Sequence, residues 1–360
     1  METEELNNFF YYSNSLPKIL KKLNGSLVFS TYQANRLIFL SSPDGEKLIK
    51  YAKSFDKPMG IAFDEKKSKI ALASKTCIDV FTSSEALAKN YPEKKNKFDY
   101  LFIPQVKYHT GYLDTHEMEY GSDGELYFVN TMFSCISKLS ADKHFEFYWK
   151  PYFIKELTPT DQCHLNGMAM KEGKPAYVTM FERKTSTFGW KKSKGDGGLL
   201  MDVNSNKVIV DNLKMPHSPV YYDNKVYFLS SGSGTVNCYD IKTKETKLIC
   251  RMNTFVRGLQ VIDDYLIVAA SKMREKIRET LPDFNYNSED SYCGIYIIDR
   301  FNGKKMGGIS YVDLVSEIFA VKLLKNIKVP SILNDNDTLV DKNIMADLDL
   351  NFWIKKKDKV

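Results

Sequence analysis

Histidines and other chemically active side chains open several similar segments of this chain. The stretch CHLNGMAM, Cys163 to Met170, places His164 two residues before Asn166 at the start of an alternating run. His116 and His217 take the position of Asn166 in two further segments. Neutral imidazoles ligate transition metals or act as general bases, so three of the five histidines are candidates for a reaction site.

These segments belong to a set of six that repeat along the sequence. Each begins with a polar or small residue and then alternates, and all but the last pass through a tight turn into further β-rich runs. The six starts are Met59, His116, Asn166, His217, Arg257 and Glu317. They lie 40 to 60 residues apart. A period near this length is typical of four-stranded propeller blades.

The two ends of the chain complement each other in this pattern. The sixth unit, EIFAVKLL, lacks its last three strands, and the runs 26–31, 36–42 and 46–55 supply them. We therefore predict an all-β protein with a single six-bladed β-propeller over residues 26–330, whose N-terminal strands pair with the C-terminal inner strand. Residues 1–25 are expected as an extension with a short helix, and 331–360 as a polar tail. An irregular β-sandwich is the alternative, but it gives no reason for six like-patterned segments.

The propeller places the candidate residues on one rim. The first strand of each blade lines the channel, and its start shares a face with the turn between the second and third strands. The candidate substrate-binding residues on this rim are Asn166, Arg257, Lys272, Arg274, Asn130, Tyr32 and Gln33.

Two chemical interpretations of the rim stay open. In the first, His116, His164 and His217 bind a divalent transition metal (Zn, Mn or Fe), with Glu317 as a further ligand or acid/base. In the second, no metal is used: His116 or His217 is the general base, while Arg257 and its cationic neighbours hold an anionic substrate.

Purely structural roles are the alternative for each residue. A histidine that opens a strand can satisfy loop carbonyls, and Arg257 can pair with Glu317 as a salt bridge that closes the ring. CHLNG can be a tight turn in which Asn166 and Gly167 take left-handed angles.

Composition excludes several classes of protein. The 360 residues are 43% hydrophobic with a net charge of +6 from scattered lysines, which predicts a folded chain without a nucleic-acid stripe. The acidic N-terminus is unlike a signal peptide, and no apolar run is long enough to span a membrane, so a cytoplasmic location is expected. The six cysteines lack metal-site spacing. The glycine-rich stretches lie between expected strands, so no nucleotide cofactor is expected.

Several motifs in order resemble one known family. STYQANRL, TGYLDTHEMEY, FVNTMFSCIS, CHLNGMAM, MPHSPVYY and RGLQV are similar to the signature segments of a mainly bacterial family, domain of unknown function 4915. The resemblance covers about Ser26 to Pro330 and implies no particular reaction, cofactor or catalytic residue.

The rim residues predict an enzyme that acts on a small polar or anionic molecule. A metal-assisted lyase or hydrolase step is expected, with His116, His217 and Glu317 as catalytic residues. The alternative is a non-catalytic propeller that binds a peptide, a glycan or a partner protein across its rim. The oligomeric state is not determined by these patterns.

Overall fold

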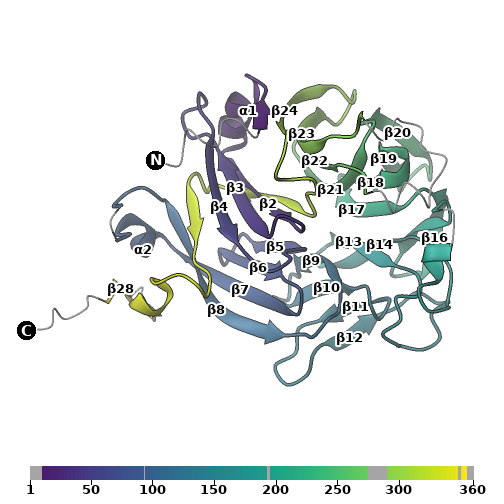
Figure 1. Ribbon diagram of the computed structural model, residues 1–360. Coiled ribbons are helices and arrows are strands. Elements are labelled where there is room, and N and C mark those ends of the chain that lie inside the picture. The colour runs from purple at the N-terminus through teal and green to yellow at the C-terminus, as the bar shows by residue number, and fades with distance from the viewer. Residues whose placement is uncertain (1–9, 93, 193–194, 275–289, 348–349, 355–360) are drawn as a thin grey trace, which may run out of the picture.

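The computed structural model describes residues 10–92, 94–192, 195–274, 290–347 and 350–354, and six sheets of these residues surround a central axis (Figure 1). The first three blades are β5–β8 (Ile61–Asp64, Lys69–Ala73, Cys77–Ser84, Tyr100–His109), β9–β12 (Thr115–Tyr120, Leu126–Asn130, Cys135–Lys138, Glu146–Trp149) and β13–β16 (Leu165–Lys171, Lys174–Met180, Gly198–Asp202, Lys207–Leu213). The next two are β17–β20 (Pro216–Tyr222, Lys225–Ser230, Thr235–Asp240, Thr246–Arg251) and β21–β24 (Phe255–Ile262, Tyr265–Ser271, Cys293–Asp299, Lys305–Tyr311). The prediction of a six-bladed β-propeller is confirmed.

The sixth blade combines the two ends of the chain. Its inner strand is β25 (Val321–Lys325), followed by β2 (Gly25–Thr31), β3 (Arg36–Ser41) and β4 (Ile49–Ser54). β2 and β25 are antiparallel, with Leu27 opposite Leu323. Each inner strand contacts the next around the axis, and β25 also contacts β5 of the first blade. Pairing within this blade therefore joins parts of the chain about 300 residues apart.

The hairpins between third and fourth strands share one turn chemistry. Asp202, Asp240 and Asp299 end β15, β19 and β23, and the side chain of each accepts backbone N–H groups two or three residues further on. An aspartate side chain that caps the following backbone in this way favours a tight turn. The same aspartate-capped turn recurs in three blades, which explains the Asp-rich turns of the sequence.

Further elements cover the outside of the ring. β1 (Phe10–Tyr12) extends the fifth blade beside β24, and α1 (Leu16–Leu23) buries Leu16, Leu20 and Leu23. β26 (Pro330–Ile332) runs parallel to β8, while α2 (Glu85–Lys89) and the hairpin of β27 (Asn343–Ala346) and β28 (Leu350–Trp353) lie beyond it. The short 3-10 turns are η2 (Gly189–Lys192), η3 (Ser231–Ser233) and η5 (Val340–Lys342). Trp353 donates from Nε1 to the Leu87 carbonyl, which fastens the tail segment to α2.

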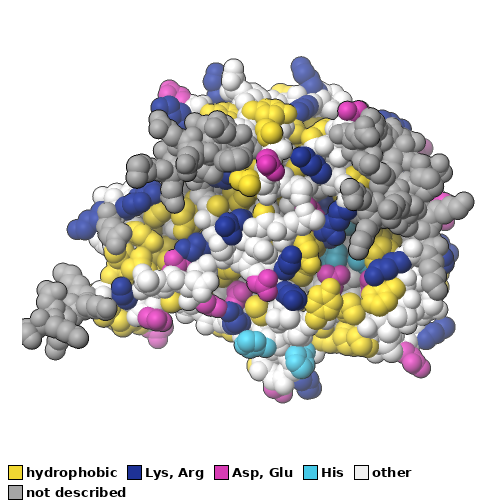
Figure 2. Space-filling model, in the orientation of Figure 1, with side chains coloured by type: hydrophobic (Ala, Val, Ile, Leu, Met, Phe, Trp, Pro, Cys, Tyr) yellow, Lys and Arg dark blue, Asp and Glu magenta, His cyan; other side chains and the backbone are white. Residues whose placement is uncertain are grey.

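Charged side chains on the visible face are interspersed. Figure 2 shows Lys and Arg alternating with Asp and Glu over this face, with no continuous stripe of one sign among the coloured residues. None of the helices in the described ranges is long and apolar enough to cross a membrane.

Candidate functional site

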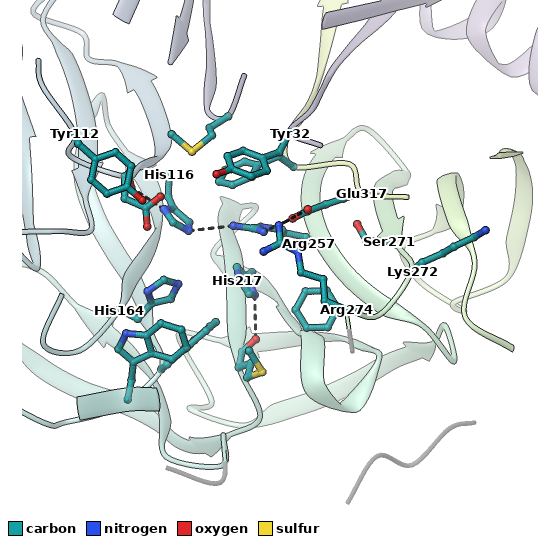
Figure 3. A pocket seen from close by; sticks show the side chains of 17 residues that line it. Tyr32, Tyr112, His116, His164, His217, Arg257, Ser271, Lys272, Arg274 and Glu317 are labelled. Atoms are coloured by element: carbon teal, nitrogen blue, oxygen red, sulfur yellow. Dashed lines mark hydrogen bonds and ion pairs between the residues drawn. The ribbon is translucent and has the colours of Figure 1, made fainter. Parts of the chain in front are cut away.

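A pocket of about 270 Å³ lies where the inner strands begin (Figure 3). The predicted rim residues that line it are Tyr32, His116, His164, His217, Arg257, Lys272, Arg274 and Glu317. Three other predicted residues do not line it. Asn166 lies beneath it in the channel, the Gln33 side chain accepts a hydrogen bond from Ser316, and Asn130 is buried at the end of β10.

His116 and His217 are held by the same local geometry in the second and fourth blades. Nδ1 of His116 lies 2.8 Å from the carbonyl oxygen of Asp114, and Nδ1 of His217 lies 3.1 Å from that of Met215. In both blades the residue two positions before the histidine has a left-handed backbone conformation, with φ of 51° at Asp114 and 49° at Met215. This unusual backbone turns the carbonyl toward the ring, so Nδ1 carries the hydrogen and Nε2 keeps its lone pair.

A hydroxyl at the end of the second strand supports each of these rings. Thr131 Oγ1 is 2.9 Å from His116 Nδ1, and Ser231 Oγ is 2.7 Å from His217 Nδ1. Four hydroxyls at this position donate to a carbonyl at the start of the next blade: Ser30 to Met59, Thr131 to Leu165, Ser231 to Val256 and Ser271 to Ile318. The hydroxyls that orient the histidines therefore also join adjacent blades.

Burial keeps two of the three imidazoles uncharged. Desolvation lowers the pKa of His116 to about 4, with the positive charge of Arg257 acting in the same direction and Asp114 opposing it. Desolvation, followed by the charge of Arg257, also holds the pKa of His217 well below its usual value. Both rings are therefore neutral acceptors at pH 7.

His164 has different surroundings, which include a carboxylate. Its Nδ1 lies 2.9 Å from Oδ2 of Asp161, and Trp190 Nε1 donates to the same oxygen at 2.7 Å. Burial opposes ionisation of Asp161, but the charge of His164 and these hydrogen bonds outweigh it and lower its pKa. A buried carboxylate on Nδ1 fixes the tautomer and directs the basic Nε2 toward the pocket.

Asp161 and Trp190 were not predicted from the sequence. The available signal was an aspartate three residues before His164, in the segment DQCH. A tight turn at CHLNG was the structural alternative, but the left-handed residues of this segment are Asp161 and His164, with φ of 41° and 50°, rather than Asn166 and Gly167.

Glu317 links two arginines across the pocket. It accepts from Nη1 of Arg257 at 2.6 Å and from Nη2 of Arg274, and its side chain is 5% exposed. Nη2 of Arg257 lies 3.1 Å from Nε2 of His116, and its guanidinium stacks 3.8 Å from the centre of the Phe319 ring. The Arg257–Glu317 salt bridge is therefore present, and it orients a cation toward the histidines (Figure 3).

The positions of the donor atoms bear on the predicted metal centre. Within the described ranges, no group of three or more His, Cys, Asp or Glu side chains could hold a metal ion. The lone pair of His116 Nε2 faces a guanidinium, which would repel a cation bound there. Zn, Mn or Fe at His116, His164 and His217 would require Arg257 to move. Metal binding stays a prediction, and no reaction step below depends on it.

Aromatic and sulfur side chains complete the lining. Phe181, Met215 and Phe255 form a buried cluster on which Trp190 packs, and Tyr112, Met59 and Phe319 also border the cavity. Met59 was one of the six predicted starts, but the aromatic residues of this group were missed because strand-end aromatics are usually core. Of this group, Tyr112 is the most exposed, at 55%.

A second, much smaller cavity lies below the pocket. It measures about 10 Å³ and is bordered by Glu117, Asn166, His217 and Arg257, among others. Nδ2 of Asn166 and Nε of Arg257 are buried without a protein hydrogen-bond partner. A cavity of this size with several polar partners suits one water molecule. Desolvation raises the pKa of Glu117 to about 7, although Lys322 opposes the shift.

The fold and the rim pocket define a six-bladed β-propeller with a ligand-sized site at one mouth of its channel. The chain belongs to the family described as Domain of unknown function (DUF4915), whose model matches residues 14–333. No curated protein matches the chain.

Solved structures with a similar fold share little sequence with this chain. A chain of a nidogen/laminin complex gives a TM-score of 0.54 at 10% identity, covering 84% of this chain and 98% of that one. A protein of unknown function from Bacteroides caccae gives 0.51 at 10% identity, covering 83% and 98%. Catalytically inactive virginiamycin B lyase from Staphylococcus aureus gives 0.39 at 11% identity, covering 80% and 77%. Such likeness concerns the fold alone.

Proposed function

We propose that this protein is an enzyme that transfers a proton on a small anionic substrate, in a lyase or hydrolase reaction. The observation that carries the proposal is the Asp161–His164 pair, in which a buried carboxylate holds Nδ1 at 2.9 Å beside a pocket. His164 is the general base, and Asp161 is its positioning residue. General bases of this kind contribute about 10²- to 10⁴-fold to rate.

The cations opposite His164 bind the anion and stabilise charge that develops in the transition state. Arg257 is fixed by Glu317 and His116, so its guanidinium needs little reorganisation when the substrate arrives. Arg274 lies nearer the opening and completes the anion site, while Lys272 borders the pocket with its Nζ donating to the Val312 carbonyl. Glu317 and His116, which were predicted as catalytic residues, act here as positioning residues for Arg257.

Proton exchange with solvent tests this proposal without knowledge of the natural substrate. Carboxylates and phosphates that carry a C–H bond beside the anionic group are incubated with the protein in D₂O, and deuterium uptake or loss of a leaving group is followed by NMR. We expect wild-type protein to act on at least one compound. His164→Gln should lower that rate by about 10²- to 10⁴-fold.

Two further variants make the result specific. Asp161→Asn keeps the imidazole but disturbs its tautomer, so it should also lower the rate. His144→Gln changes an exposed histidine outside the pocket and should behave like wild type. Equal rates for His164→Gln and wild type would show that another group is the base. Binding without any turnover would favour the non-catalytic alternative.

A further inference from the structure

The pocket has two chemically different ends. The cationic end comes from the fifth and sixth blades and holds Arg257, Lys272, Arg274 and Glu317. The apolar end is the cluster of Phe181, Met215 and Phe255 with Trp190. In Figure 3, His164 and Tyr112 lie on one side of Arg257, and Lys272 and Glu317 lie on the other.

The charged side chains that line the whole pocket leave one excess positive charge. Three cationic side chains line the pocket against two carboxylates, Asp114 and Glu317, and two of the three histidines are held neutral. Both oxygens of Glu317 are already occupied by arginines. A monoanion such as a carboxylate neutralises the net charge of this lining, whereas a phosphate dianion would leave an excess of negative charge.

The apolar end is built from rings that pack on one another. The His164 ring centre lies 4.2 Å from that of Trp190 and 4.5 Å from that of Phe181. Phe181 in turn lies 5.1 Å from His217, and Phe255 lies 5.9 Å from it. Side chains spaced like this favour stacked or edge-on packing of a further ring.

His164 stands between the two ends. It packs on Phe181 and Trp190, and its ring centre is 5.2 Å from that of His116, which contacts Arg257. A ligand that spans the pocket therefore presents the carbons between its ring and its charge to the proposed base.

We infer that the substrate class is a monocarboxylate with one aromatic or similarly flat apolar group. The carboxylate meets Arg257 and Arg274, with Lys272 at the margin, and the ring packs on the aromatic cluster. That such a molecule is a substrate rests on the proposed function, but its binding does not. A cavity of about 270 Å³ limits it to a small compound.

Four matched probes test the two ends by titration calorimetry or ligand-observed NMR. 3-Phenylpropionate carries ring and charge, propionate only the charge, 3-phenylpropan-1-ol only the ring, and phenyl phosphate a dianion. We expect 3-phenylpropionate to bind at least tenfold more tightly than each of the others. If propionate bound equally tightly, the aromatic end would have no role in binding. If the alcohol bound equally tightly, the cationic end would have none. No binding of 3-phenylpropionate at millimolar concentration would overturn the inference as a whole.

Variants then assign each preference to its residues. Arg274→Gln, at a side chain that is 42% exposed, should reduce the preference for the acid over the alcohol by about tenfold. Phe255→Ala, or Phe255→Leu if the first unfolds, should reduce the preference for 3-phenylpropionate over propionate by about tenfold. Lys242→Gln, on a distant hairpin, should change neither. His164→Gln should still bind the probe, so loss of turnover and loss of binding are distinguishable.

Discussion

Three histidines of one pocket differ in what faces Nδ1. Carbonyl and hydroxyl oxygens face it in His116 and His217, whereas a buried carboxylate faces it in His164. The first two rings are neutral acceptors, and the third has the partner that a general base needs. The residue type alone therefore does not determine the role. The atom within hydrogen-bond distance of Nδ1 does.

Two neighbouring residues should give the stability of the protein opposite pH dependences. The folded-state pKa of Glu117 is raised to about 7, so its contribution is present at low pH and is lost as pH rises from about 4.5 to 7. The folded-state pKa of His116 is lowered to about 4, so its contribution is present above pH 6.5 and is lost as pH falls to 4. In the wild type the two effects largely cancel between pH 4.5 and 6.5.

Single substitutions separate these effects. As pH rises from 4.5 to 8, the unfolding free energy of Glu117→Gln should increase by roughly 2 kcal/mol relative to that of wild type. This value allows for the partial exposure of Glu117. His116→Gln should lose about 3 kcal/mol relative to wild type between pH 4 and 7. Urea unfolding at a series of pH values measures both, with His109→Gln as the control. Parallel curves for Glu117→Gln and wild type would mean that Glu117 titrates as an ordinary carboxylate.

At the scale of elements, the inner strands approach closely because alternate blades carry glycine after the rim residue. Gly60, Gly167 and Gly258 take this position in the first, third and fifth blades, and larger residues take it in the other three. A Cβ on Gly60 would lie 2.0 Å from the carbonyl oxygen of His116 in the second blade, and one on Gly167 would lie 2.4 Å from Cδ of Pro219 in the fourth blade. The motif NG in CHLNG is thus a packing requirement between blades.

The hydroxyl contacts between blades should carry measurable stability. Thr131→Val removes the donor to the Leu165 carbonyl and the contact with His116 Nδ1 inside a fully buried region. We expect a loss of about 1–3 kcal/mol in the free energy of unfolding. Thr246→Val, on the exposed edge strand β20, should stay within about 0.5 kcal/mol of wild type. Chemical denaturation compares them, and equal values would contradict a role for this hydroxyl in joining blades.

For the whole molecule, pairing of β2 with β25 should make the N-terminal strands part of one cooperative unit. Leu324 is fully buried beside Val28 and Phe39, whereas its neighbour Lys325 points to solvent. Leu324→Ala should lower stability by about 2–4 kcal/mol in a single transition, and Lys325→Ala should have little effect. Hydrogen exchange should accelerate together in β2 and in β21–β24. Separate exchange of β2–β4 would contradict the cooperative unit.

The sequence by itself determined the blades and most of the rim. Alternation with period two and Asp-rich turns are local features, so six registered segments predicted six inner strands, and eight of the predicted rim residues line the pocket. The complementary ends of the chain predicted that β25 would receive strands from the N-terminus, and the β2–β25 pairing agrees.

Only the tertiary structure decided how these residues combine. Arg257 reaches Glu317 60 residues later and His116 141 residues earlier, and no local pattern encodes contacts across a ring. The same holds for Trp190, which reaches from the 3-10 turn η2 to donate a hydrogen bond to Asp161. Gln33 and Asn130 had the right register, but their side chains bond neighbouring loop atoms instead of lining the pocket. Strand periodicity sets which residues reach the rim, while packing between blades sets which atoms meet there.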